Sequence, residues 1–179
     1  MSAEAAGGAR QLLLMRHAKS DWDAGARSDL ERPLNARGRK AAARMGRWLR
    51  DEGLAPDRVL CSPATRTRQT LEIVRDALVL PDEAVSYESR IYEASPGEIL
   101  ALVGSQAAEV GRLLVVGHNP AMEMLAAGLP ANPPREPLGH PLFPTAALAC
   151  FETEAPWAEL GPGGARLLRL VRPKELGES

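Results

Sequence analysis

Short apolar runs alternate along this chain with longer segments in which apolar residues recur at helical spacing. Continuous apolar runs bounded by polar or turn residues predict buried strands. Six such runs are found, at 11–15, 58–61, 84–88, 113–116, 146–151 and 165–171. The run at 113–116 is the strongest of them and the run at 84–88 is the weakest.

Helical periodicity fills most of the intervals between these runs. Helices are expected at 35–51, 62–78, 96–106 and 119–129. Asn35 is a favourable N-cap for the first helix. The second and the fourth open on a capping residue followed by proline, in Ser62-Pro63 and Asn119-Pro120, which predicts the N-cap and the first helical position of each.

The alternation predicts an α/β architecture with a mostly parallel sheet, because parallel strands are buried on both faces and are joined by helical crossovers. No helix separates the last two strands, so we expect an antiparallel strand near the C-terminus. The proline-rich stretch 130–144 predicts a loop. The length suits one domain, which we place at 11–173 between a disordered N-terminal tail, 1–10, and a C-terminal tail, 174–179.

The composition narrows the class of protein. Hydrophobic residues make up 45% of the 179 residues, and the net charge of −1 does not indicate binding to nucleic acid or to anionic membranes. No apolar run approaches the ~18 residues of a membrane span, and residues 1–10 lack the features of a secretory signal. Cys61 and Cys150 lie in apolar runs and are expected to be buried free thiols. We therefore expect a cytoplasmic protein.

Polar residues follow three of the predicted strands directly. The first strand runs into Arg16-His17, the second into Ser62, and the strand at 113–116 into Gly117 and then His118-Asn119. Parallel strands end at the same edge of a sheet, where open α/β proteins bind their ligands. We therefore expect two of the three histidines to meet at this edge, with Ser62 and Asn119 as further candidates for binding substrate.

Arg66 adds positive charge to the same edge. On a helical wheel it shares the inward arc with Thr70 and Val74, and a buried guanidinium needs an anionic partner because it does not lose its charge. The N-terminus of that helix also offers free N–H groups to an anion. Together with Arg16, these groups predict a site for a phosphoryl group, or for a similar anion such as sulfate, around the two histidines.

Each residue also has a purely structural interpretation. His17 could bond to the backbone and His118 could begin a turn. Arg16 could lie on the surface, and Arg66 could pair with a structural carboxylate such as Glu93. The joint placement at three strand ends favours the functional interpretation. His140 lies in the proline-rich loop and is interpreted as structural.

Other chemistries fit the spacing less well. A cysteine phosphatase separates its cysteine and arginine by five residues, whereas four residues separate Cys61 from Arg66 and six separate it from Arg68. The GxxxxGK[ST] motif of a nucleotide-binding P-loop is absent. The two histidines and Asp21 could ligate a metal, but two arginines beside them would repel a cation, so no metal and no cofactor is expected.

Five blocks of the sequence resemble, in order, those of the histidine phosphatase superfamily, the phosphoglycerate mutase-like proteins, and more narrowly its short SixA-type phosphohistidine phosphatases. They are LLLMRHAKSDW, ERPLNARGRKAA, VLCSPATRTRQT, LLVVGHNP and FPTAALA, and the similarity spans residues 11–173. The resemblance implies a three-layer α/β/α sandwich and a phosphatase that needs no metal.

The resemblance also implies a role for each matched residue. His17 would be the nucleophile that receives the phosphoryl group on a ring nitrogen, and water would then hydrolyse the phosphohistidine. Arg16, Arg66 and His118 would hold the phosphoryl oxygens. Asp23 stands where many members have an asparagine that binds the phosphoryl group, and it is given no such role.

Glu93 is the nearest match to the acid that protonates the leaving group in many members. It is interpreted as that acid, as a surface carboxylate or as a partner of an arginine. A phosphohistidine releases imidazole, which leaves more easily than an alkoxide and needs little acid catalysis. Residues 94–112 leave no room for the lid of larger relatives. Both arguments favour phosphohistidine proteins as substrates. The alternatives are a phosphomonoesterase or mutase acting on small phosphorylated metabolites, and a weakly active phosphoprotein-binding module.

Overall fold

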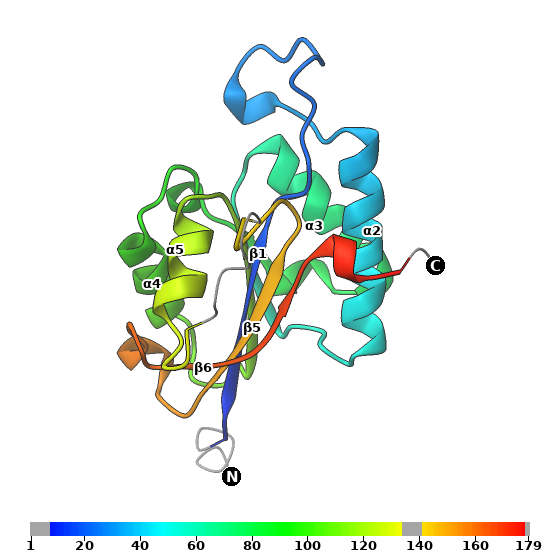
Figure 1. Ribbon diagram of the computed structural model, residues 1–179. Helices are drawn as coiled ribbons and strands as arrows, with labels where there is room; N and C mark the ends of the chain where they lie inside the picture. Colours follow the sequence, from blue (N-terminus) through cyan, green and yellow to red (C-terminus); the bar gives the residue numbers. More distant parts are fainter. Residues whose placement is uncertain (1–7, 134–140, 178–179) are drawn as a thin grey trace.

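The computed structural model describes residues 8–133 and 141–177 (Figure 1). His140, the middle of the 130–144 loop and most of the expected N-terminal tail therefore lie outside the described residues. The described parts of that loop form no helix, and Pro130 makes one isolated bridge to Ala165. Within the described ranges, no helix is both long and apolar enough to cross a membrane.

Six strands form one mixed sheet in the order β3-β2-β4-β1-β5-β6. Their bounds are β1 Arg10–Arg16, β2 Arg58–Cys61, β3 Val85–Tyr87, β4 Arg112–Gly117, β5 Leu148–Thr153 and β6 Arg166–Val171. The pairs β1–β4, β4–β2 and β2–β3 are parallel, and β5 is antiparallel to both of its neighbours. The prediction of a mostly parallel sheet with an antiparallel strand near the C-terminus is confirmed.

Four α-helices of the described chain cover the sheet, α2 and α3 on one face and α4 and α5 on the other (Figure 1). Their bounds are α2 Ala36–Asp51, α3 Thr65–Leu78, α4 Pro96–Gly104 and α5 Ala121–Gly128. Leu13 and Met15 of β1 belong to the core beneath α2 and α3, whereas Leu12 and Leu14 belong to the core on the other face. Burial on both faces explains the continuous apolar runs and gives the three-layer α/β/α sandwich.

The domain is slightly longer at both ends than the sequence indicates. β1 begins at Arg10, within the expected N-terminal tail, because the Arg10 side chain is buried against the domain. At the C-terminus, the 3-10 turn Pro173–Glu175 and Leu176, which packs against the core, extend into the expected tail. Cys61 and Cys150 are buried free thiols, as expected.

The cap of α3 differs from the prediction, although the cap of α2 does not. Asn35 caps α2 with its side-chain oxygen, as expected. α3 begins at Thr65, so Ser62 is not its N-cap and Pro63 is not its first residue. The helical backbone starts only at Thr65 because Ala64 is still extended, with ψ of 144°. The hydroxyl of the fully buried Ser62 accepts from the backbone N–H of Ala64, at 3.3 Å, and also bonds to the ring of His118.

The start of α5 is also displaced from the prediction. Pro120 is the N-cap and Ala121 the first helical residue, so the expected cap and first position each move by one residue. Asn119 still accepts a hydrogen bond from the backbone N–H of Glu123, at 3.2 Å, so its side chain stabilises the first turn. A capping residue followed by proline therefore locates the start of each helix but not its cap.

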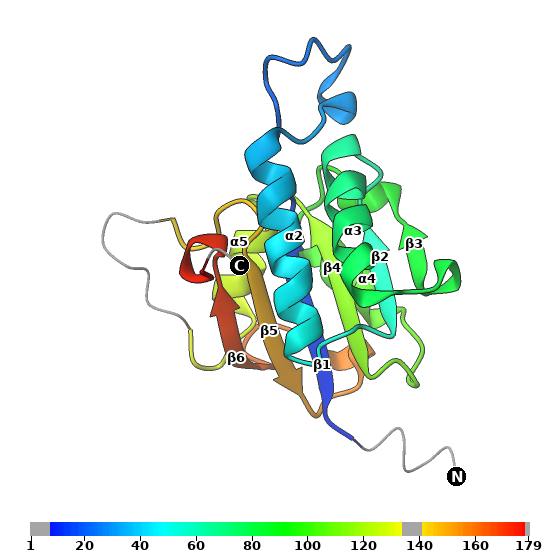
Figure 2. The same ribbon diagram turned by 90° about the vertical axis from the view of Figure 1, so that its right-hand side faces the viewer.

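Residues 17–35 project beyond the carboxyl end of β1 before the chain returns into α2 (Figures 1 and 2). The return is fixed where the backbone N–H of Asn35 donates to the carbonyl oxygen of Lys19, at 3.0 Å. Gly38 packs against the same peptide so closely that a Cβ there would overlap the Lys19 carbonyl oxygen. The projecting loop contains the 3-10 turn Asp29–Glu31 and lies at the edge of the sheet where the candidate residues gather.

Candidate active site

The carboxyl ends of β1, β2 and β4 bring the candidate residues together. β4 lies between β1 and β2, and the backbone N–H groups of His17 and Ser62 donate to the carbonyl oxygens of Gly117 and Val116, each at 3.1 Å. His118 follows β4 directly, and its ring centroid is 5.3 Å from that of His17. The two histidines therefore meet at one edge of the sheet, as expected.

The imidazole of His17 is held as one neutral tautomer. Its side chain is buried, and Nδ1 lies 2.7 Å from the carbonyl oxygen of Ala18. A carbonyl oxygen only accepts, so Nδ1 carries the proton and Nε2 keeps its lone pair. The pKa of His17 is lowered to about 3, mainly by burial, with His118, Arg16 and Arg66 acting in the same direction and the bond to Ala18 against it. The ring is therefore uncharged at pH 7, with the lone pair of Nε2 free.

Thr70 connects the loop after His17 to the helix that carries Arg66. Its Oγ1 accepts a hydrogen bond from the backbone N–H of Ala18, at 3.0 Å, and donates to the carbonyl oxygen of Arg66, at 2.7 Å. On the other side of His17, its carbonyl oxygen accepts from the backbone N–H of Ala146, at 2.9 Å. These bonds fix the position of the imidazole relative to Arg66.

Arg66 lies on the buried face of α3, as the helical wheel indicates. Its partner is Asp29, not Glu93: Nη1 donates to the Asp29 carbonyl oxygen at 2.7 Å and Nη2 to Oδ2 at 2.9 Å. Tyr92 lies beside this pair, with its ring centroid 6.0 Å from the guanidinium carbon. Arg66 therefore does pair with a carboxylate of the protein, but that carboxylate is Asp29 and not the suggested Glu93.

Arg16 and Asn119 meet at one carbonyl group. Arg16 donates through Nη1 to the carbonyl oxygen of Phe143 at 3.4 Å, and Asn119 donates through Nδ2 to the same atom at 2.9 Å. Burial lowers the pKa of Arg16, and the carboxylate of Glu123 opposes this shift. Both polar atoms of the Asn119 side chain have partners in the protein, so Asn119 stabilises the structure around the site.

Among the described residues, His118 is bonded through one ring nitrogen only. Its Nε2 lies 2.8 Å from the hydroxyl oxygen of Ser62, and the edge of the Tyr92 ring faces it at a centroid distance of 5.5 Å. Burial lowers the pKa of His118 to about 4, with Arg66 acting in the same direction and Asp29 against it. Ser62 thus contacts the site through His118.

Three side-chain nitrogens at this edge are buried without a hydrogen-bond partner among the described residues. They are Nε of Arg16, Nε of Arg66 and Nδ1 of His118. A buried polar group without a partner costs about 1–3 kcal/mol, and more when it is charged. The oxygens of an anion bound beside His17 would satisfy these groups.

Glu93 stands apart from this cluster. Its side chain is exposed and, within the described residues, makes no hydrogen bond or ion pair. Its backbone adopts a left-handed conformation, with φ of 62°, next to Tyr92. Asp23 is exposed as well, and its backbone N–H donates to Asp21.

Asp29, Tyr92 and Thr70 are the residues of the site whose contacts the sequence does not reveal. An inward arginine indicated that some carboxylate would be needed, but no periodicity marks Asp29 within its loop. In the part of the chain that the structure describes, no group of three or more histidine, cysteine or acidic residues could hold a metal ion.

Comparison with known proteins agrees with this geometry. The sequence profile of the histidine phosphatase superfamily (branch 1) matches residues 12–102. An uncharacterised protein of Mycobacterium tuberculosis (strain ATCC 25618 / H37Rv) is 37% identical over 164 residues, which are 89% of this chain and 100% of that protein. Phosphohistidine phosphatase SixA of Escherichia coli (strain K12) is 35% identical over 141 residues, which cover 78% of this chain and 83% of SixA.

A solved structure is also similar over nearly the whole domain. It is that of the protein histidine phosphatase SixA complexed with tungstate, at a TM-score of 0.75 and 29% identity, and the match covers 92% of this chain and 98% of that one. The profile match, the relatives and the arrangement of Arg16-His17, Arg66 and His118 lead to one conclusion. The chain belongs to the histidine phosphatase superfamily.

Proposed function

We propose that this chain is a phosphatase that transfers a phosphoryl group to Nε2 of His17 and then hydrolyses the phosphohistidine, with phosphohistidine-bearing proteins as its substrates. The observation that carries the proposal is the set of three buried, unpartnered nitrogens beside a neutral His17. The SixA structure complexed with tungstate supports it, since tungstate is a tetrahedral oxyanion like phosphate.

The first half-reaction moves the phosphoryl group from one imidazole to another. The lone pair of Nε2 attacks phosphorus, the P–N bond of the substrate breaks, and its imidazole leaves as a neutral ring when its other nitrogen is protonated. The proton of His17 stays on Nδ1, which donates to the carbonyl oxygen of Ala18, and this hydrogen bond stabilises the positive charge that develops on the ring. In the second half-reaction water attacks phosphorus and the P–Nε2 bond breaks. His17 leaves as the neutral Nδ1–H ring, and the protons of the water pass to the released phosphate and to solvent.

The two arginines and His118 stabilise the charge on the transferring group. Phosphoryl transfer depends on positioning and on electrostatic stabilisation of the equatorial oxygens. Arg16 and Arg66 provide fixed positive charge, and His118 provides a nitrogen without a protein partner. These groups supply the charge that a metal ion supplies in other phosphoryl-transfer enzymes, so the proposed reaction is metal-independent.

Two features favour a phosphohistidine over a phosphoester as the substrate. Glu93, the candidate acid, is exposed and makes no hydrogen bond or ion pair with the cluster among the described residues, and imidazole leaves with little help from an acid. Half of the segment between Glu93 and β4 is α4, whose Ile99, Leu102 and Val103 are buried in the core. A short segment that packs in this way supports access for a side chain carried on another protein.

The test is phosphate release from a phosphohistidine protein and from p-nitrophenyl phosphate, measured in parallel with a chelator present. Wild type should release phosphate from the phosphohistidine protein and His17→Ala should not. Arg66→Ala should lower kcat/KM about a hundredfold to a thousandfold, as the loss of a transition-state donor does. Arg68→Ala is the matched control, because Arg68 lies on the exposed face of the same helix.

Each alternative has its own outcome. Turnover of p-nitrophenyl phosphate alone would assign the site to small phosphoesters. Binding of a phosphohistidine protein without turnover would indicate the phosphoprotein-binding module. Equal activity of wild type and His17→Ala would contradict the proposed mechanism.

A further inference from the structure

Asp29 holds the guanidinium of Arg66 with two of its oxygens. Its carbonyl oxygen accepts from Nη1 and its Oδ2 from Nη2, at 2.7 and 2.9 Å. The bond joins residues that lie far apart in the sequence, one in the projecting loop and one in the first turn of α3. Nε of Arg66 is left buried and without a partner among the described residues. Asp29 therefore binds the Nη end of the guanidinium and leaves Nε available.

The same carboxylate connects a second wall of the site. The hydroxyl of Tyr92 donates to Oδ2 of Asp29 at 2.5 Å, and the Tyr92 ring faces the ring of His118 edge-on. One carboxylate thus fixes both Arg66 and the aromatic side chain beside His118. The hydrogen bond from Tyr92 and the two neighbouring arginines hold the pKa of Asp29 well below its usual range, so the group stays ionised at neutral pH.

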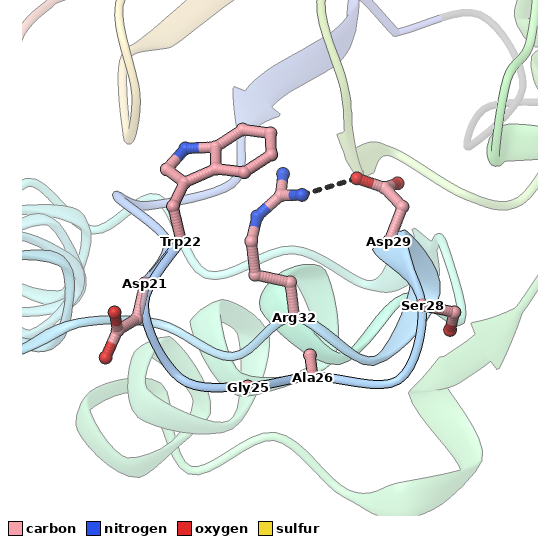
Figure 3. A pocket seen from close by; sticks show the side chains of 7 residues that line it. All are labelled: Asp21, Trp22, Gly25, Ala26, Ser28, Asp29 and Arg32. Atoms are coloured by element: carbon pink, nitrogen blue, oxygen red, sulfur yellow. Dashed lines mark hydrogen bonds and ion pairs between the residues drawn. The ribbon is translucent and has the colours of Figure 1, made fainter.

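Arg32 fixes Asp29 from the other side. In Figure 3 its guanidinium reaches from beside Trp22 to the carboxylate of Asp29. It lies 3.5 Å from the centroid of the Trp22 ring, and its Nε donates to the Ser20 hydroxyl at 2.9 Å. Arg32, Trp22 and Asp29 are among the residues that line a pocket of about 300 Å³ in the projecting loop, and Asp29 stands between that pocket and Arg66.

We propose that Asp29 is a positioning residue for phosphoryl transfer, which orients Arg66 toward the phosphoryl group and holds Tyr92 against His118. This inference rests on the proposed function of the site. The opposite role would be inhibitory, with the carboxylate occupying Arg66 in place of the substrate. Two observations favour positioning. Nε of Arg66 has no partner among the described residues, and Arg32 as well as Arg66 compensates the charge of Asp29.

The two roles predict opposite effects for Asp29→Asn. Removing a negative charge beside an anion site strengthens anion binding by simple electrostatics. Loss of positioning weakens it, because Arg66 is no longer held. Glu31→Gln is the matched control: Glu31 lies in the same 3-10 turn and pairs with Arg27, at 3.2 Å. Tyr92→Phe is a second variant that keeps the ring and loses the bond to Asp29.

The measurements are kcat and KM on both substrates, and the affinity for inorganic phosphate by calorimetry. We expect Asp29→Asn to lower kcat by up to about a hundredfold, as misplacement of a catalytic group does. It should also weaken phosphate binding, while Glu31→Gln changes neither and Tyr92→Phe lowers kcat by less. Tighter phosphate binding or a higher kcat in Asp29→Asn would overturn the proposal, and so would an unchanged kcat with lower stability. If wild type turns over neither substrate, the proposed function is overturned instead. In that case the phosphate affinities of Asp29→Asn and Tyr92→Phe still test whether Asp29 positions Arg66.

Discussion

The Nδ1 atom of His17 lies 2.7 Å from the carbonyl oxygen of Ala18, and this contact determines which ring nitrogen can react. We expect His17 in the free protein at pH 7 to be a neutral Nδ1–H tautomer with an unprotonated Nε2. Two-bond ¹H–¹⁵N correlation spectra of the histidine rings measure this directly. A proton on Nε2, or an imidazolium at pH 7, would contradict the assignment of Nε2 as the nucleophile.

The buried histidines predict a loss of stability in mild acid. In the folded protein, burial lowers the pKa of His17 to about 3 and that of His118 to about 4. Both titrate near 6.5 in the unfolded chain, so below that pH the unfolded chain binds more protons. The stability that depends on these groups is therefore complete above pH ~6.5 and is lost as the pH falls toward the folded pKa values.

Urea unfolding at pH 7 and pH 5 measures this loss. His17 alone should reduce the free energy of unfolding by about 2 kcal/mol between these values. His118→Gln should lose less stability than wild type over the same interval, because one titrating ring has been removed. Asp29, whose folded pKa is also lowered, adds to the loss only below about pH 4. Equal stability of wild type at pH 7 and pH 5 would refute the burial of neutral histidines.

Thr70→Val should damage both stability and catalysis. The valine keeps the shape of the side chain but leaves the backbone N–H of Ala18 and the carbonyl oxygen of Arg66 without the hydroxyl that joins them. We expect a loss of about 1–3 kcal/mol in the free energy of unfolding, and a lower kcat. Thr70→Ser keeps the hydroxyl and should retain most of the activity. A fully active Thr70→Val protein would show that this link does not position the site.

Gly38→Ala should destabilise the return of the projecting loop into α2. A Cβ at this position would overlap the carbonyl oxygen of Lys19, a backbone atom that cannot move without shifting the loop. We expect a cost of about 1–3 kcal/mol, measured by urea unfolding. Gly128→Ala is the control, since a Cβ at the end of α5 has no heavy atom within 4 Å in the described structure. Equal stability of the two variants would contradict the close packing at Gly38.

The sequence predicts the sheet and the meeting of His17 with His118 because both follow from general rules. Continuous apolar runs mark strands that are buried on both faces, and parallel strands place their carboxyl ends at one edge. The inward position of Arg66 follows from helical periodicity alone. No tertiary information is needed for any of these inferences.

The partners of these residues could not be predicted in the same way. Arg66 was expected to need an anion, but the projecting loop contains four carboxylates, Asp21, Asp23, Asp29 and Glu31, and no periodicity singles one out. Only the folded position of that loop brings Asp29 to Arg66. Ser62 carries the pattern of an N-cap, yet its hydroxyl bonds to His118 across the sheet edge. Such choices between a local and a distant partner depend on tertiary structure.

Transfer of the phosphoryl group to His17 is the central claim, and a single-turnover experiment tests it most directly. Enzyme in excess would be mixed with a ³²P-labelled phosphohistidine protein, quenched in alkali within milliseconds to seconds, and digested for mass spectrometry. We expect label on the peptide that contains His17, appearing before free phosphate and absent from His17→Ala. Release of phosphate with no label on His17, or label that persists in His17→Ala, would contradict the account.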